Sequence, residues 1–268
     1  LASKNALVKR RNDDKTNIHF KEINDKLLDI IYDEKNKFIK NYSFKLSKTR
    51  LRYVETNNPD KNLFINNYNK RFIGCDGMQV VVNKKAVNNN NIKCSKSGNY
   101  GVIIISSLFD VINNIPISYY AIESTKNDNK KVNETEGFVQ QINKLNDNDI
   151  VIFDRWYYGY EFQKTLDNKN IGYVFRTKNN SKLLKDMQFN TSKKININNK
   201  NVQLFKYKIK NMTYNILTSI TENITIDEIK ALYWRRWKIE TDNKKFKYDI
   251  LRNNIRSKNY LNIYDLNS

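Results

Sequence analysis

Residues 150–176, IVIFDRWYYGYEFQKTLDNKNIGYVFR, carry the clearest indication of the fold. The run begins with four apolar residues, Ile150–Phe153, and Asp154 follows them directly. Short apolar runs bounded by polar residues predict buried strands, and residues 171–178 predict a second one. The intervening segment 157–170 predicts a helix. A strand, a helix and a strand in succession indicate an α/β protein.

The flanking segments extend this order. Residues 71–82, RFIGCDGMQVVV, predict a strand that ends near Asp76 or continues past it, and residues 202–221 predict a β-hairpin. Residues 179–200 are polar, and we expect them to be irregular. Further strands are predicted at 101–111 and 115–124, joined by a turn at Asn113-Asn114, and helices at 1–48, at 134–145 and from Asp227 past Lys247. The sequence therefore predicts a mixed α/β sheet with flanking helices.

The charge of the chain indicates a polyanionic partner. There are 48 basic and 28 acidic residues, which give a net charge of +20. Such an excess is typical of proteins that bind nucleic acid. A lysine-rich composition inherited from an AT-rich genome is an alternative that accounts for the same charge. No run of about 18 apolar residues exists, so no transmembrane helix is predicted.

Several kinds of site are excluded by composition. The chain has two cysteines, Cys75 and Cys94, without a CxxC pair, and one histidine, His19. A zinc site of Cys and His ligands cannot be assembled from these residues. A catalytic triad would need His19, which has no supporting motif. A metal here must therefore be held by carboxylates, which favour Mg²⁺ or Mn²⁺.

Three acids lie where a metal could be shared. Asp76 lies in a predicted strand, Asp154 ends another, and Glu240 lies midway along the last predicted helix. Carboxylates from neighbouring strands and an abutting helix can together hold two ions that clamp a phosphodiester. Because the chain has 28 acids, some of them flank strands by chance.

The last predicted helix carries the most specific motif. Tyr233, Arg236, Glu240 and Lys247 follow the spacing Y-x2-R-x3-E-x6-K. At about 100° per residue, all four project from one stripe about 60° wide. Arg236 and Lys247 suit DNA phosphates, and Glu240 suits a metal ion. The alternative is a solvated helix face with an i,i+4 ion pair between Arg236 and Glu240.

This motif resembles the signature of DDE (two-aspartate, one-glutamate) transposases of the insertion-sequence-four group. The segments Cys75-Asp76-Gly77 and Asp154-Arg155 are similar to the surroundings of the family's two aspartates. The resemblance implies a ribonuclease H-like fold. It also implies that Asp76, Asp154 and Glu240 are the catalytic residues and that they bind two ions of Mg²⁺ or Mn²⁺. It further implies that Tyr233, Arg236 and Lys247 bind DNA. Arg155 and Arg176 are further candidates for DNA binding, with packing or an ion pair as the alternative role. Met78 and Trp156 depart from the family's usual Thr and Gly, and segment 179–221 contains no tryptophan.

The resemblance also implies the organisation of the chain. Residues 1–66 are expected to be a helical DNA-binding or linker segment, which we interpret as truncated because the chain begins at Leu1. Residues 67–178 would form the first part of the catalytic core, 179–221 a β-rich insertion, and 222–268 the C-terminal helical part. The implied partner is double-stranded DNA, at transposon ends and target, bound by a homodimer in the cytoplasm without a membrane.

Two other functions remain open from the sequence. A different ribonuclease H-like nuclease would share the acids, and its helix signature would be coincidental. Such an enzyme would cut DNA without joining it. A decayed or domesticated transposase would bind DNA without catalysis, and metal-dependent cleavage would distinguish it from an active enzyme.

Overall fold

The computed structural model describes residues 14–33, 44–45, 62–63, 70–83, 93–94, 100–113, 115–126, 130–147, 149–178, 182–184, 186–221 and 224–245. The main strands are β3 (Phe72–Asn83), β4 (Tyr100–Asp110), β5 (Ile115–Glu123), β6 (Ile150–Phe153), β7 (Gly172–Arg176), β8 (Thr191–Ile197), β9 (Lys200–Ile209) and β10 (Met212–Thr218). The helices are α2 (Asp14–Tyr32), α4 (Lys130–Gln141), α5 (Tyr160–Asn168) and α6 (Ile226–Lys245). Two short strands, β1 (Phe44–Lys45) and β2 (Asn62–Leu63), pair with each other, and the 3-10 turns are Ile142–Lys144 and Lys182–Leu184.

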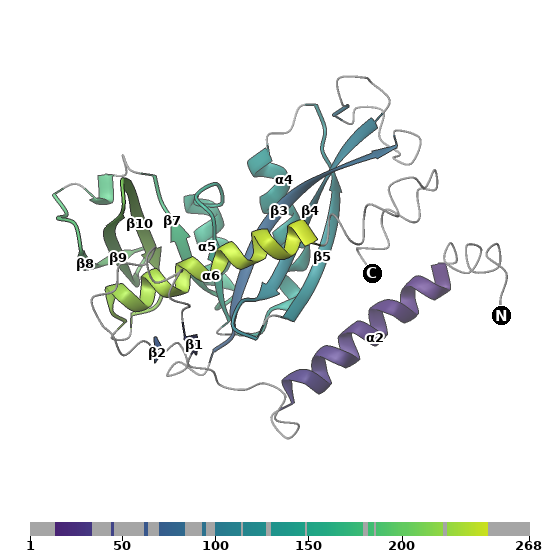
Figure 1. The fold of residues 1–268 in the computed structure, drawn as a ribbon, viewed down its shortest axis with the longest axis horizontal. Helices are drawn as coiled ribbons and strands as arrows, with labels where there is room; N and C mark the ends of the chain where they lie inside the picture. Colours follow the sequence, from purple (N-terminus) through teal and green to yellow (C-terminus); the bar gives the residue numbers. More distant parts are fainter. Residues whose placement is uncertain are drawn as a thin grey trace.

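One mixed sheet organises the molecule, with the strand order β5-β4-β3-β6-β7-β10-β9-β8 (Figure 1). β3 pairs in parallel with β6, and β6 in parallel with β7. All other neighbours in this sheet are antiparallel. Three antiparallel strands followed by two parallel ones, with helices on both faces, confirm the predicted ribonuclease H-like mixed sheet.

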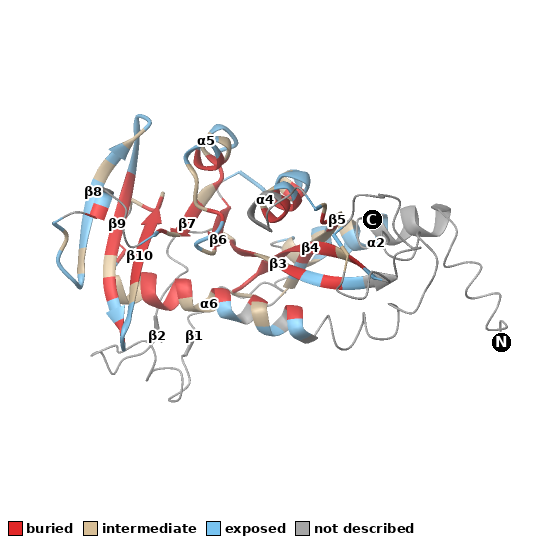
Figure 2. Ribbon diagram, turned by 90° about the horizontal axis from the view of Figure 1, so that it is seen from above, coloured by how far each residue is buried: buried red, intermediate tan, exposed pale blue. Residues whose placement is uncertain are grey.

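The sheet is the middle of three layers. Figure 2 shows α4 and α5 on one face and α6 on the other. All four residues of β6 are buried, as expected for a strand that is covered on both faces. On the α4 and α5 face, Phe153 packs edge-on against Phe138 and Phe162, with ring centroids 5.0 and 5.2 Å apart. On the other face, Leu232 and Ile239 of α6 are buried among the apolar side chains of the sheet.

The two edge strands are shaped by their sequences. β5 contains Pro116, which lacks a backbone N–H, and the β4–β5 register shifts beside it. At the other edge, Lys193 and Lys194 of β8 are exposed. Charged residues on an edge strand disfavour pairing with another chain.

Two sequence predictions were wrong in part. A helix was predicted over residues 1–48, but α2 ends at Tyr32 and residues 44–45 form a strand, while 1–13 and 34–43 lie outside the described residues. Residues 179–200 were predicted to be irregular, yet 191–197 form β8. This strand pairs along one edge only and is mostly exposed, so its sequence lacks the apolar alternation that marks a half-buried strand.

The start of α6 follows from a capping motif. The backbone N–H of Thr225 donates to Glu228 Oε2 at 2.7 Å, and the N–H of Glu228 is 3.2 Å from Thr225 Oγ1. This reciprocal pair is a capping box, which stabilises the first turn of a helix. The helix begins at Ile226, one residue before the predicted start, and is described as far as Lys245. No helix in the described ranges is long and apolar enough to cross a bilayer.

Gly74 allows α6 to approach β3 closely. A Cβ atom at this position would overlap the side chain of Ile239 and lie 2.9 Å from Val111 Cγ1. Glu240 follows Ile239 directly, so this contact sets the distance between that carboxylate and the sheet.

We predict that Gly74→Ala destabilises the protein by about 1–3 kcal/mol, because the added methyl group overpacks the α6 interface. Urea unfolding at neutral pH measures the change. Ile239→Val removes the terminal methyl group nearest to the new Cβ, so the double variant should recover part of the loss. A cost below about 0.5 kcal/mol would be that of an ordinary surface substitution and would contradict the packing argument.

Candidate active site

The two aspartates lie side by side on adjacent parallel strands. β3 continues past Asp76, and Asp154 directly follows β6, as predicted. Gly74 is paired with Ile152, so two more residues along each strand bring Asp76 and Asp154 to the same level. Side chains two apart point to the same face of a strand, which here is the face covered by α6. The sheet therefore directs both carboxylates toward the helix that carries Glu240.

The charged stripe of α6 faces inward. Tyr233 is only 2% exposed and Arg236 only 4%, whereas Glu240 is half-buried. Leu232 and Ile239 on the adjacent stripe are buried as well. The predicted i,i+4 pair exists, since Arg236 Nη2 donates to Glu240 Oε1 at 2.7 Å. Because Arg236 is buried, this stripe is not a solvated helix face.

Arg236 is the cation around which the three acids are arranged. Its Nη1 lies 3.9 Å from Asp76 Oδ1, and its Nη2 binds Glu240. Burial by itself lowers the pKa of Arg236, but the negative groups around it, Asp154 among them, raise the pKa above its ordinary value. Arg236 is therefore the counter-charge for this acidic group in the free protein.

The ionised form of Asp76 is disfavoured even though Arg236 lies beside it. Burial raises its pKa to about 6 from an ordinary value of 3.8. Arg236 and a hydrogen bond from Asn243 lower the pKa, whereas Glu240 and Asp154 raise it. Repulsion between carboxylates at one place is the condition that a bound divalent cation relieves.

Asn243 is a site residue that the sequence analysis did not identify. Its Nδ2 donates to Asp76 Oδ2 at 3.0 Å, and its Oδ1 lies 3.0 Å from Ser107 Oγ. On a helix, Asn243 follows Arg236 by seven residues and so lies on the same stripe. Spacing could therefore have singled it out.

Several donors at this site lack an acceptor within the part of the chain that the structure describes. The Tyr233 hydroxyl and the Nε and Nη1 atoms of Arg236 are buried and make no hydrogen bond at standard distances. Burial raises the pKa of Tyr233 to about 12, so its hydroxyl is a donor at neutral pH. Buried donors almost always have partners in the functional state of a protein, and an anionic oxygen would satisfy these.

The other predicted DNA-binding residues lie in different surroundings. Arg155 is exposed, and its backbone N–H donates to Asp154 Oδ1 at 2.5 Å. The guanidinium of Arg176 stacks over Tyr214 at 4.4 Å from the ring centroid. Lys247 lies outside the described residues. Tyr214 itself is buried in the core of the sheet, beside Tyr207 and Phe205 of β9.

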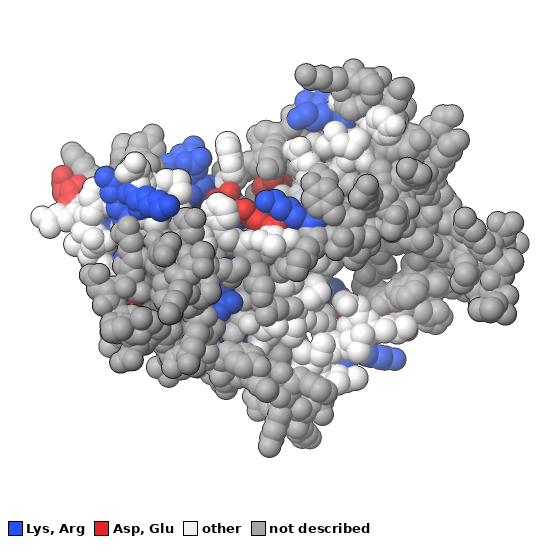
Figure 3. Space-filling model, in the orientation of Figure 1, with Lys and Arg blue, Asp and Glu red and all other residues white. Residues whose placement is uncertain are grey.

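The carboxylate oxygens of this site suit a hard cation, although the three acids do not form a cluster that could hold one ion together. In the described ranges, no three or more His, Cys, Asp or Glu side chains are close enough to hold one ion together. Arg236 contacts two of the three acids, Asp76 and Glu240. In Figure 3, acidic and basic side chains lie beside each other near the middle of the face of the molecule that is shown.

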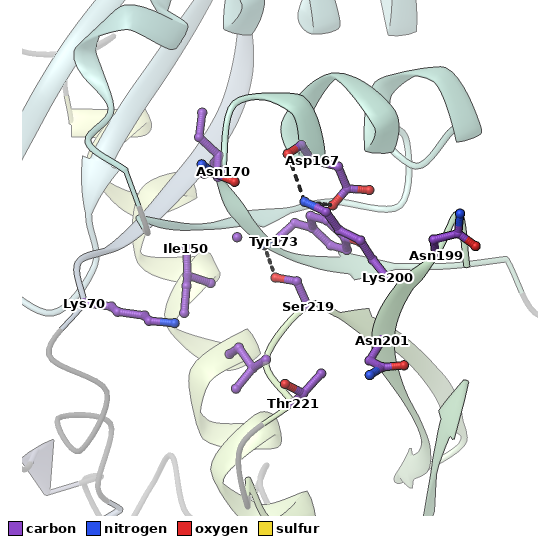
Figure 4. Close-up of a pocket in the computed structure, with 13 residues that line it drawn as sticks. Lys70, Ile150, Asp167, Asn170, Tyr173, Asn199, Lys200, Asn201, Ser219 and Thr221 are labelled. Carbon is purple, nitrogen blue, oxygen red and sulfur yellow. Dashed lines mark hydrogen bonds and ion pairs between the residues drawn. The ribbon is translucent and has the colours of Figure 1, made fainter. Parts of the chain in front are cut away.

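A pocket of about 430 Å³ lies elsewhere and is not this site (Figure 4). It is lined by Ile150 and Gly172, which begin β6 and β7, whereas Asp154 follows the far end of β6. The four residues of β6 rise about 3.3 Å each, so the pocket lies about 13 Å from the acids. Lys200 crosses it and binds the backbone carbonyl of Asp167 at 2.9 Å.

We predict that Asp76→Asn raises the melting temperature at pH 8. The pKa of Asp76 is raised in the folded state, so the unfolded chain releases this proton first as the pH rises from about 4 to about 6. Stability falls across that window and stays lower above it. Removing the ionisable group should therefore stabilise the protein at pH 8 and have little effect below pH 4.

Thermal unfolding at both pH values measures this difference, and Asp147→Asn, at an exposed position, is the matched control. A variant that melts at or below the wild-type temperature at pH 8 would show that Arg236 outweighs burial and repulsion.

Comparison with known proteins agrees with this geometry. The transposase DDE domain family matches residues 83–264, a range that includes Asp154 and Glu240 and begins after Asp76. A search of curated proteins finds no match.

Three solved structures show weaker likeness. The piggyBac transposase synaptic complex with hairpin DNA has a TM-score of 0.44 at 14% identity, over 66% of this chain and 40% of the other. Endonuclease V from Bacillus subtilis has a TM-score of 0.36 at 12% identity, over 69% and 83%. The NurA nuclease from Sulfolobus solfataricus has a TM-score of 0.34 at 10% identity, over 87% and 94%.

The chain thus spans 40% of the length of the piggyBac chain that it resembles, and these likenesses add nothing to the family assignment. The family match covers most of the chain, including the segment that positions the second aspartate and the glutamate. The chain therefore belongs to the transposase DDE domain family.

Proposed function

We propose that this protein is a DNA transposase that cuts DNA at the ends of an insertion sequence and joins those ends to a target. The observation that carries the proposal is the buried guanidinium of Arg236. It lies beside Asp76 and Glu240, with Asp154 in electrostatic range and two of its own donor atoms unsatisfied. Carboxylates for a cation and donors for a phosphate at one place are what phosphodiester chemistry requires.

Each side chain has a role in the proposed reaction. Asp76, Asp154 and Glu240 hold two divalent ions, which are Mg²⁺ or Mn²⁺. When bound, such ions activate the attacking oxygen and stabilise the leaving oxygen. Tyr233 and Arg236 donate hydrogen bonds to the phosphate, which offers an acceptor for the Tyr233 hydroxyl and for the Arg236 donor atoms that have none among the described residues. Arg155 and Lys247 add contacts to the DNA backbone.

The chemistry proceeds in two displacements at phosphorus. In the first, the oxygen of a water molecule attacks the phosphorus, the bond to the 3′-oxygen breaks, and that oxygen takes a proton to become a 3′-hydroxyl. In the second, this 3′-hydroxyl loses its proton, attacks a phosphorus of the target DNA and displaces the target's 3′-oxygen. Two DNA ends must be joined together, so we propose a homodimer in the DNA complex.

The positive charge of the chain supports a DNA partner. With a net charge of +20, contacts to phosphates supply affinity that is independent of sequence and falls as salt rises. Such affinity does not need the acids, which allows DNA binding and catalysis to be separated experimentally.

We predict that Glu240→Gln lowers metal-dependent cleavage and joining by at least about 100-fold, because the helix loses its carboxylate for the ion. The assay uses a DNA fragment that carries the sequences flanking the coding region, together with a target plasmid, in Mg²⁺ or Mn²⁺. DNA binding in a chelating buffer is the control and should be unchanged. If the wild-type protein cuts but never joins, it is a nuclease; cleavage retained by the variant would exclude Glu240 from catalysis.

We predict that Arg236→Lys lowers cleavage by about 10–100-fold although the positive charge is kept. A lysine cannot present several fixed donors to Glu240 and a phosphate at the same time, and each lost charged hydrogen bond is worth about 1.5–3 kcal/mol. Single-turnover cleavage with saturating DNA measures the loss. Trp237→Phe, at the partly exposed neighbouring position, is the matched control. Wild-type rates in Arg236→Lys would show that Arg236 acts only through its charge.

A further inference from the structure

A buried asparagine ties α6 to two neighbouring strands of the sheet, β3 and β4. Asn243 is only 5% exposed and Ser107 on β4 only 2%. Ser107 is paired directly with Asp76 across the β3–β4 ladder. Asn243 Nδ2 donates to Asp76 Oδ2, and the Ser107 hydroxyl donates to Asn243 Oδ1, both at 3.0 Å. The three side chains form a continuous chain of hydrogen bonds from one strand through the helix to the next strand.

The Asp76 carboxylate fixes which way the amide of Asn243 points. An ionised carboxylate can only accept, so Nδ2 faces Asp76, and Oδ1 is left to accept from the Ser107 hydroxyl. This hydroxyl lies 3.0 Å from Asn243 Oδ1, against 3.2 Å from the Asp76 carbonyl oxygen. Ser107 therefore holds the amide in the orientation that Asp76 requires.

Asn243 occupies one oxygen of Asp76 and leaves the other available. Asp76 Oδ2 accepts from Asn243 at 3.0 Å, whereas Oδ1 is the atom that lies 3.9 Å from Arg236 Nη1. The amide is neutral, so it orients the carboxylate without neutralising it. A lysine at this position would instead compete with a cation for the same charge.

We propose that Asn243, held by Ser107, is a positioning residue that directs Asp76 Oδ1 toward the ion, a role that rests on the proposed function. Asn243 lies three residues after Glu240 on the same helix. By holding Asp76, it also fixes the distance between the carboxylate on the strand and the carboxylate on the helix. Partners that orient a metal ligand in this way commonly change metal affinity by about 10–100-fold when they are removed.

The experiment titrates Mn²⁺ into the full chain without DNA and measures binding by calorimetry. Asn243→Ala should weaken Mn²⁺ affinity by about 10–100-fold. Ser107→Ala is milder, because Asn243 stays in place without its orienting donor, and a weakening of a few-fold is expected. Ser106→Ala is the matched control: this neighbouring buried serine points to the opposite face, toward Gly137 of α4, and its loss should leave Mn²⁺ affinity unchanged.

Thermal unfolding of the same variants in a chelating buffer separates positioning from stability. Lower melting temperatures with wild-type Mn²⁺ affinity in both Asn243→Ala and Ser107→Ala would overturn this inference and leave the proposed function standing. If the wild-type chain itself bound no Mn²⁺, the proposed metal-dependent function would fail, and the positioning role would fail with it. Weaker Mn²⁺ binding in Ser107→Ala at an unchanged melting temperature would support the inference even if Asn243→Ala did not fold.

Discussion

The site depends on the close packing of α6 across the centre of the sheet. Gly74 leaves space for Ile239, and the next residue on the helix is Glu240. This contact brings the glutamate and Arg236 over the strands that carry Asp76 and Asp154. A larger residue at position 74 would lift the helix and separate the carboxylates. The packing of one helix on one glycine thus sets the geometry of the chemistry.

Burial of this charged group has opposite consequences for stability and for function. Burial raises the pKa of Asp76, and the charges of Glu240 and Asp154 raise it further. Arg236 offsets part of this cost, although two of its donor atoms find no acceptor among the described residues. An arrangement that is unfavourable in the free protein is suited to bind cations and phosphates, since these ligands supply the missing charges and acceptors.

Much of the fold was predictable because strong local patterns agree with the tertiary structure. The apolar run Ile150–Phe153 is buried on both faces, and the hairpin predicted over residues 202–221 is formed by β9 and β10. β8 was missed because an exposed edge strand needs no apolar alternation. The three acids were predicted as site residues from their positions in or after predicted strands and on the last helix, together with a family resemblance, and the helix motif was predicted from its spacing. Asn243 was not, although it lies on the same helix stripe, because a chain rich in asparagine places this residue at many positions and its partners are seen only in the structure.

The sequence was enough to predict the order of the buried strands and of the last helix, the residue types available for a metal site, and the stripe that Tyr233, Arg236 and Glu240 share. These properties are local, since they follow from the periods of strands and helices. The three-dimensional packing was needed to show that this stripe faces inward, that Arg236 contacts Asp76 and Glu240 together, and that Asn243 bridges Asp76 and Ser107. Such contacts join residues far apart in the chain, and their geometry depends on how closely the helix packs against the sheet.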